Sequence, residues 1–254
     1  MILKRKIYKK LLEWKKECQG KKALLIEGAR RIGKSTICEE FGKSEYKSFL
    51  LIDFAKKDKE VEGYFEKYLN DLDTFFMLLQ THFGTKLTER NSLIIFDEVQ
   101  MFPQARAAIK YLVADGRYDY IETGSLISIR ENVKNIVIPS EERHINMYPL
   151  DFEEFAIALE EDLLVEYIKK CFEKREPLER SMHNQAMLLF HQYMLVGGMP
   201  MSVVTFIESK KDFTEADREK RDILKLYRED IMKIDAKYRS KVLAIYDQIP
   251  GFLS

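Results

Sequence analysis

Residues 28–36 read GARRIGKST, and this segment constrains the fold of the chain more than any other. Gly28 is followed, after four residues, by Gly33, Lys34 and Ser35, which is the pattern G-x-x-x-x-G-K-[ST]. The glycines allow the backbone to curl so that successive N–H groups point toward one phosphate. In this pattern the lysine reaches the β- and γ-phosphates and the serine hydroxyl binds Mg²⁺. The segment therefore predicts a phosphate-binding loop between a strand and a helix.

The segments on both sides of the loop fit this prediction. Residues 21–27, KKALLIE, contain a short apolar run that is typical of a buried strand. Residues 34–41, KSTICEEF, predict a helix that Gly42 would end, and the dipole of this helix favours an anion at its N-terminus. An ordinary strand–helix turn rich in glycine and lysine is the alternative. The residues expected to bind the nucleotide are Gly28, Ala29, Arg30, Arg31, Ile32, Gly33, Lys34, Ser35 and Thr36.

The second informative segment is SLIIFDEVQ, residues 92–100. Its continuous apolar run, Leu93–Phe96, is typical of a central parallel strand that is buried on both faces. Asp97 and Glu98 then place two carboxylates at the carboxyl end of that strand, where open α/β sheets bind ligands. We expect Asp97 to hold Mg²⁺, directly or through water, and Glu98 to orient and deprotonate an attacking water. The alternative is a charged strand end that faces solvent.

Several segments spread over most of residues 20–250 carry a family resemblance. They are GARRIGKST, SLIIFDEVQMFPQARAAIKYL, DGRYDYIETGSLISI, MYPLDFEEFAIAL, VGGMP, ILKLYREDIMKID and IYDQIP. Through them the chain resembles a family of prokaryotic, archaeal and bacterial, AAA-type P-loop ATPases whose members carry a nuclease-like C-terminal domain. The resemblance implies an AAA-type core that binds ATP with Mg²⁺, followed by a helical segment.

The chain departs from this family at three places. The family usually has proline where Ala29 stands and threonine where Ser35 stands, and both changes are chemically mild. The third departure is the end of the sequence at IPGFLS, where relatives continue into a winged-helix-like segment and the nuclease-like domain. We therefore expect a truncated member, a split-gene product or a fragment.

A further polar strand end lies in YDYIETGSLIS, residues 118–128. In ATPases of the additional-strand type, a polar residue here contacts the γ-phosphate and helps to position the water. Thr123 is the first candidate for this catalytic role, beside Lys34 and Glu98, and Ser125 is the second. A turn is the alternative reading of Thr-Gly-Ser.

Strand and helix signals alternate along the first part of the chain. Residues 48–54 predict a strand, Asp73-Thr74 begin a helix that Gly84 should end, and Pro103 precedes a helix through about Val113. Residues 136–138 predict a fifth strand. This alternation favours an α/β fold, a parallel sheet with helices on both faces. The resemblance implies the strand order 5-1-4-3-2.

The composition changes after Pro149, so we expect a P-loop ATPase core at 1–149 and an all-helical lid or adaptor at 150–254, incomplete at its C-terminus. Asp151 and Glu154 have the spacing of a capping box. One apolar stripe is expected from Phe152, Phe155, Leu159 and Leu163. Five methionines predict helical core in preference to a protein-binding surface: Met182, Met187, Met194, Met199 and Met201.

The 42 basic and 42 acidic residues cancel, which argues against a chain that coats nucleic acid. Residues 1–22 nevertheless hold nine lysines and arginines, so a nucleic-acid contact there stays an unsupported alternative. In the same segment Ile7, Leu11, Trp14 and Cys18 recur at helical spacing. They predict an amphipathic helix that packs on the core, in a position that would also allow it to cover the adenine.

Cys18, Cys38 and Cys171 form no metal-binding or disulfide pattern, and the histidines show no metal-ligand spacing. No continuous apolar run follows the basic residues near the start, so we expect no signal peptide, and no apolar stretch approaches the ~20 residues that span a bilayer. We therefore expect a cytoplasmic protein that does not enter a membrane.

Together these features predict a Mg²⁺-dependent ATPase in which Glu98 aims the water. The alternative is an ATP-dependent interaction module with little turnover because its C-terminal part is missing. The resemblance also implies a homo-oligomer, while the protein partner stays unknown. Four arginines are candidates for an arginine finger supplied to a neighbouring subunit: Arg106, Arg117, Arg130 and Arg143.

Overall fold

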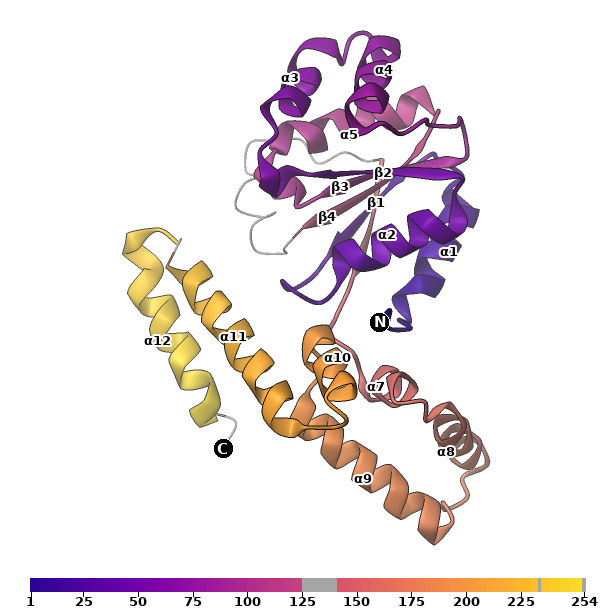
Figure 1. The fold of residues 1–254 in the computed structure, drawn as a ribbon, viewed down its shortest axis with the longest axis vertical. Coiled ribbons are helices and arrows are strands. Elements are labelled where there is room, and N and C mark those ends of the chain that lie inside the picture. Colours follow the sequence, from indigo (N-terminus) through magenta and orange to yellow (C-terminus); the bar gives the residue numbers. More distant parts are fainter. Residues whose placement is uncertain (125–140, 233, 253–254) are drawn as a thin grey trace. The chain divides into compact units, whose positions relative to one another are not determined.

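The computed structural model describes residues 1–124, 141–232 and 234–252. The contacts within the chain divide it into two compact units, which Figure 1 shows in sequence colours. The first unit is Lys4–Pro149, and the second joins Met1–Leu3 to Leu150–Ser254.

A five-stranded parallel sheet forms the centre of the first unit, in the order β2-β3-β4-β1-β5. The strands are β1 (Ala23–Glu27), β2 (Ser48–Asp53), β3 (Ser92–Asp97), β4 (Asp119–Gly124) and β5 (Glu142–Asn146). Every residue of β3 and β4 is buried, as expected for central strands. The predicted α/β P-loop fold and the order 5-1-4-3-2 are confirmed. Because β3, β4 and β1 are parallel neighbours, their carboxyl ends lie at one edge of the sheet.

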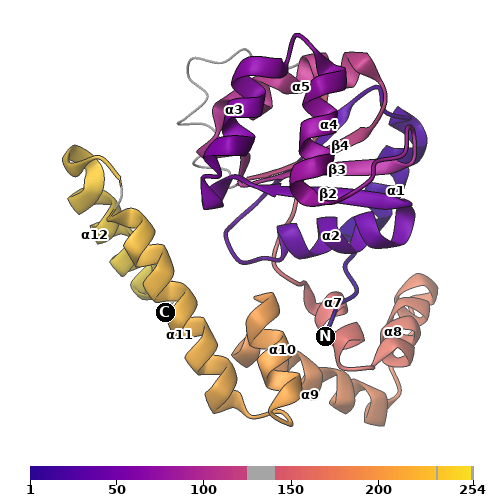
Figure 2. The same ribbon diagram turned by 45° about the horizontal axis from the view of Figure 1, so that its top comes forward.

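Helices cover both faces of this sheet (Figure 2). The helices and short 3-10 turns of the first unit are α1 (Ile7–Cys18), α2 (Lys34–Glu45), η1 (Phe54–Lys56), α3 (Lys59–Tyr68), α4 (Leu72–Phe83), η2 (Val99–Met101) and α5 (Pro103–Asp115). Helices α1 and α2 lie on one face, and α3, α4 and α5 lie on the other (Figures 1 and 2).

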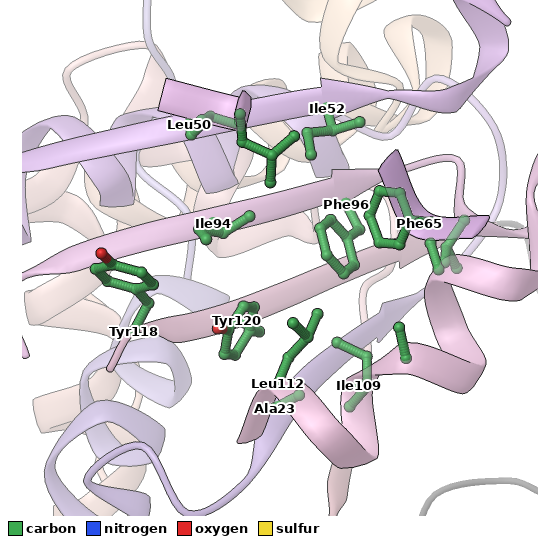
Figure 3. Close-up of a cluster of buried hydrophobic side chains, with 14 of the residues drawn as sticks. Ala23, Leu50, Ile52, Phe65, Ile94, Phe96, Ile109, Leu112, Tyr118 and Tyr120 are labelled. Atoms are coloured by element: carbon green, nitrogen blue, oxygen red, sulfur yellow. The ribbon is translucent and has the colours of Figure 1, made fainter. Parts of the chain in front are cut away.

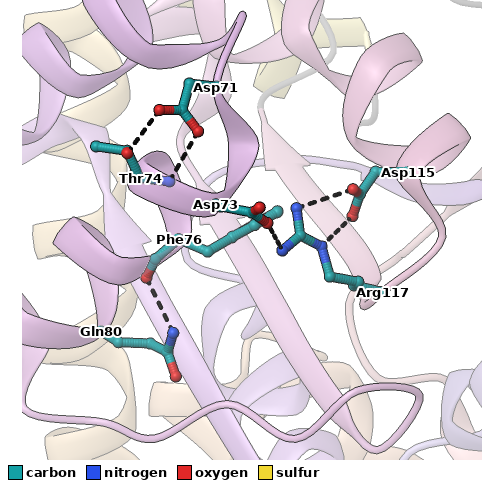
Figure 4. A network of polar contacts seen from close by, with 7 residues as sticks. All are labelled: Asp71, Asp73, Thr74, Phe76, Gln80, Asp115 and Arg117. Carbon is teal, nitrogen blue, oxygen red and sulfur yellow. Dashed lines mark hydrogen bonds and ion pairs between the residues drawn. The ribbon is translucent and has the colours of Figure 1, made fainter.

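Two boundaries differ from the sequence predictions. Helix α4 begins at Leu72, one residue early, because the side chain of Asp71 accepts hydrogen bonds from Thr74 N and Thr74 Oγ1 (Figure 4). Gly84 ends it at φ +60°, as predicted. Residues 136–138, the predicted fifth strand, lie outside the described residues. The strand that pairs with β1 at the edge of the sheet is Glu142–Asn146.

Aromatic side chains fill the core between the sheet and helices α3, α4 and α5 (Figure 3). The rings of Phe65 and Phe96 pack edge to face at 5.6 Å between centroids, and Phe65 meets Phe75 at 5.0 Å. Phe96 is the residue directly before Asp97, so this packing fixes the end of β3.

The opposite face is closed by the N-terminal helix. Ile7, Leu11 and Trp14 are buried as predicted, whereas Cys18 is only half-buried. The Trp14 ring lies 6.4 Å from that of Phe41 in α2, and its indole N–H donates to Lys22 O at 3.0 Å. The predicted amphipathic helix is therefore part of the core of this unit.

The second unit is helical and has a core of its own. Its helices are α7 (Phe152–Ala158), α8 (Asp162–Lys174), α9 (Arg180–Val196), α10 (Pro200–Glu208), α11 (Phe213–Ile231) and α12 (Ala236–Phe252). The largest buried side chains of this core are Phe155 and Phe206. The capping box of α7 is confirmed, because Glu154 N donates to Asp151 Oδ1 at 2.9 Å and Asp151 N donates to Glu154 Oε2.

Two core predictions in this unit are correct only in part. In the expected stripe Phe155 is buried, and Phe152 and Leu159 pack against the same core. Leu163 is 81% exposed, because α7 ends at Ala158 and α8 begins at Asp162. Of the five methionines, Met182 packs against this core. Three others, Met187, Met194 and Met201, are exposed because α9 and α10 pack through other residues such as Leu189 and Val203.

Among the described helices, none alone has the length and apolarity needed to cross a bilayer. Helices α9 and α10 meet that criterion only when taken together, across a bend of 118°.

Candidate functional site

The predicted phosphate-binding loop lies between the end of β1 and the start of α2, at Lys34. Gly33 adopts φ +89°, a conformation that glycine takes without strain. A Cβ on Gly28 would lie 2.4 Å from Met147 O and 2.6 Å from Ile32 Cδ1, so this position requires glycine because of close packing. The side chains of Ala29, Arg30, Arg31 and Thr36 are exposed, and that of Ile32 is buried.

Lys34 is only 5% exposed, and its ammonium is held by the loop itself. Its Nζ donates to Ala29 O at 2.8 Å and to Gly28 O at 3.1 Å. Burial lowers the pKa of Lys34 from its ordinary value, and the negative charges of Glu98 and then Asp97 oppose this shift. The charges of both carboxylates at the acidic strand end thus act on the ammonium.

Hydrogen bonds join the loop to the ends of β3 and β4. Ser35 Oγ donates to Asp97 Oδ1 at 2.8 Å, and the Thr123 hydroxyl donates to the same carboxylate oxygen. Thr123 Oγ1 also accepts from Glu98 N at 3.2 Å. The structure therefore brings together four of the predicted site residues at the carboxyl edge of the sheet.

Glu98 has an unusual backbone for a residue that is not glycine, with φ +53° and ψ +45°. Its carboxylate accepts a hydrogen bond at Oε2 from Nε2 of Gln100, which lies in η2 and is 7% exposed. Sequence reasoning missed Gln100, although it stands in the same DEVQ segment.

Arg5 is a second residue that sequence reasoning missed. Its guanidinium donates from Nη1 to Ile32 O at 3.0 Å and from Nη2 to Tyr148 O at 2.6 Å. It therefore fastens the loop to the segment that follows β5. Arg5 could not be singled out from the sequence, because eight other lysines and arginines in residues 1–22 carry the same charge.

Three of the four arginine-finger candidates have partners inside the chain. Arg106 is 2% exposed and forms a bidentate pair with Glu142, at 2.8 and 3.2 Å, so the hypothesis that it reaches a neighbouring subunit is wrong. Arg117 pairs with Asp115 and Asp73 beside the start of β4, as Figure 4 shows. The last two candidates are Arg143, which pairs with Glu17 at 2.5 Å, and Arg130, which like Ser125 lies outside the described residues.

A buried acidic cluster lies on the α5 side of the sheet. Glu122 is fully buried, and burial, followed by the charge of Glu142, raises its pKa well above the ordinary value, while Arg106 opposes the shift. His144 lies 3.3 Å from Glu142 and 3.3 Å from Glu27, the residue before the loop. Nothing in the sequence patterns marked this cluster.

Comparisons with known proteins identify the family of the chain. A model of the AAA_14 family, described as an AAA domain, matches residues 20–156. Among solved structures, the Aeropyrum pernix ORC1 protein in complex with DNA is similar at 9% identity and a TM-score of 0.38, over 77% of this chain and 68% of that chain. C. elegans PCH-2 is similar at 12% identity and a TM-score of 0.42, over 85% of this chain and 65% of that chain. No curated protein matches the chain.

The matched residues include the loop, the acidic strand end and Thr123, and they make up more than half of the sequence. The chain therefore belongs to the AAA_14 family of AAA domains, a membership that implies the binding of ATP and suggests an NTPase.

Proposed function

We propose that the chain is a Mg²⁺-dependent ATPase in which Glu98 orients a water for attack on the γ-phosphate. The observation that carries this proposal is the hydrogen-bonded set of Ser35, Asp97, Thr123 and Glu98, which lies beside the buried ammonium of Lys34.

Lys34 would exchange its bonds to two loop carbonyls for bonds to the phosphates. Those carbonyl bonds, at 2.8 and 3.1 Å, keep the ammonium inside the loop and close to where a phosphate would lie. The backbone N–H groups at the start of α2 would add partial positive charge. Residues 28–36 thereby neutralise a polyanion without a large rearrangement.

Ser35 and Asp97 would hold Mg²⁺. A hydroxyl and a carboxylate oxygen 2.8 Å apart are hard oxygen donors of the kind that this ion prefers. Among the described residues no group of three histidine, cysteine, aspartate or glutamate side chains could hold a metal, so the ion would depend on phosphate oxygens as well. Bound there, Mg²⁺ would supply positive charge next to the phosphates.

Thr123 would fix the position of the Asp97 carboxylate relative to the backbone of Glu98. Its hydroxyl bonds both residues, one through the carboxylate and the other through the backbone N–H. Glu98 would then accept a proton from water, a role that contributes about 10²–10⁴-fold in other enzymes.

Steady-state phosphate release tests the proposal. We expect Glu98→Gln to lower turnover by about 100-fold or more and to keep ATP binding, and Lys34→Ala to lose both. Glu98→Gln removes the charge without changing the shape of the side chain, so it is the matched control for folding. If wild type and Glu98→Gln bind ATP but release phosphate equally slowly, the chain is an ATP-dependent interaction module.

We also propose that residues 150–254 act as a helical lid or adaptor and that copies of the chain assemble. The support for assembly is the resemblance to AAA-type ATPases. Arg106 is buried and paired with Glu142, so it is not proposed as the arginine finger between copies. Native mass spectrometry with and without ATP tests the assembly. The family match supports no statement about a nuclease-like domain, so the proposal is confined to nucleotide chemistry.

A further inference from the structure

Gln100 occupies an unusual position for a glutamine. It lies in the short turn η2, two residues after Glu98, and is only 7% exposed. Its Nε2 donates a hydrogen bond to Glu98 Oε2. Burial of an amide N–H is unfavourable unless it finds a partner, and the carboxylate of Glu98 is the partner that the structure gives to Nε2.

The backbone of Glu98 is held separately from its side chain. Its φ of +53° is a strained conformation for glutamate, and Thr123 Oγ1 accepts from its N–H at 3.2 Å. These features fix the Cα, but the rotatable bonds of a glutamate side chain leave the carboxylate free to move. Among the described residues, the hydrogen bond that the structure gives this carboxylate comes from Gln100.

The charge of the carboxylate so held acts on the lysine of the phosphate-binding loop. Of the charges that act on Lys34, that of Glu98 is the strongest and exceeds that of Asp97. Glu98 therefore lies near the lysine ammonium while its Oε2 is bound by Gln100.

We propose that Gln100 is a positioning residue, whose amide holds Oε2 of Glu98 so that Oε1 is presented to the attacking water. This inference rests on the proposed ATPase function. In the reaction the water oxygen bonds to the γ-phosphorus, the bond to the β–γ bridging oxygen breaks, and the water proton passes to Oε1. The products are ADP and phosphate.

The test compares Gln100→Leu and Gln100→Glu with wild type in the full chain. Leucine keeps the volume but removes the donor, and glutamate keeps the shape but repels Glu98. We expect both to lower kcat for ATP by about 10–100-fold, because small misplacement of a reacting group has effects of this size. KM and the ATP-induced rise in melting temperature should change less than about 2-fold. Gln104→Leu, at an exposed position in α5, is the matched control and should leave kcat unchanged.

A positioning role is distinguished from a structural one by epistasis. In a Glu98→Gln background, Gln100→Leu should cause no further loss of kcat, because the group that it positions is absent. A full additional loss there, or a wild-type kcat in both single variants, would overturn the inference. If Gln100→Leu does not fold, Gln100→Glu alone decides the outcome. If wild type releases no phosphate, the proposed function fails and this inference fails with it.

Discussion

At the scale of single residues, the least expected group is the carboxyl of Glu122. It lies in β4, one residue before Thr123, on the face that α5 covers. Glu142 and the guanidinium of Arg106 surround it, and the Arg106–Glu142 pair neutralises itself. Glu122 is thus a second buried carboxyl beside a guanidinium that Glu142 already neutralises, and the imidazole of His144 lies 3.3 Å from Glu142. Its neutral form is the one that the fold stabilises.

This arrangement makes the stability of the first unit depend on pH. The pKa of Glu122 is raised in the folded state, so its stabilising contribution is complete below the unfolded value near 4.5 and is lost as pH rises toward the folded value. Over that interval the free energy of unfolding should fall by up to about 1.4 kcal/mol per pH unit. Glu122→Gln removes this dependence and should be more stable than wild type at pH 7–8. Urea unfolding followed by Trp14 fluorescence measures it, and parallel pH profiles for the two proteins would contradict the prediction.

Residues of the candidate site could be predicted from the sequence where they stand next to one another in a short motif. The loop pattern and the Asp97-Glu98 pair are each contained in a few consecutive residues. Gln100, Arg5 and Glu122 were missed because their roles depend on contacts that only the folded chain creates. The Arg5–Tyr148 bond, for example, spans 143 positions in the sequence. The catalytic and metal roles assigned to Lys34, Ser35, Asp97, Glu98 and Thr123 stay predictions.

At the scale of elements, the residues that begin and end helices were predicted reliably, whereas the residues that a helix buries were predicted less well. The capping box at Asp151 and the glycine stop at Gly84 follow from backbone hydrogen bonding, which acts within four residues. The apolar stripe was correct from Phe152 to Leu159 and wrong at Leu163, because the backbone turns between α7 and α8 and changes the face that a residue presents. The spacing of hydrophobic residues does not reveal such a turn when the residues in the turn also have high helix propensity.

The junction of α9 and α10 depends on one glycine. Leu150 N donates to Gly198 O at 2.7 Å, and a Cβ on Gly198 would lie 2.1 Å from Leu150 O. We expect Gly198→Ala to destabilise the second unit by about 1–3 kcal/mol, because the added methyl group forces two backbone segments apart. Thermal unfolding followed by circular dichroism measures the effect.

Gly63→Ala is the control for that experiment. Gly63 lies within α3, and a Cβ there has nothing within 4 Å. Alanine should stabilise this helix by about 0.5–1 kcal/mol through its higher helix propensity. A Gly198→Ala protein that melts at or above the wild-type temperature would show that the close approach at Leu150 carries no energetic weight.

At the scale of the whole molecule, each of the two units has buried hydrophobic side chains of its own. Those of the first unit lie on both faces of the sheet, and those of the second lie among the helices after Leu150. Sequence composition indicated a change near Pro149, and the contacts divide the chain between Pro149 and Leu150. The short N-terminal piece Met1–Leu3 groups with the second unit, which no local pattern indicated. Only contacts distant in sequence could place it there.

A probe for the first unit alone is built into the sequence, because Trp14 is the single tryptophan of the chain and is 1% exposed there. ATP with Mg²⁺ at ~100 times its dissociation constant should stabilise the unit that binds it by ~2.7 kcal/mol. For a chain of this size that corresponds to a rise of about 5–10 °C in the melting temperature reported by Trp14 emission. Lys34→Ala should abolish the rise because it removes the ammonium from the loop, whereas Glu98→Gln should keep it. If ATP leaves the Trp14 transition unmoved in the wild-type chain, the nucleotide does not bind at this loop under those conditions, and the site proposed at the ends of β1, β3 and β4 is wrong.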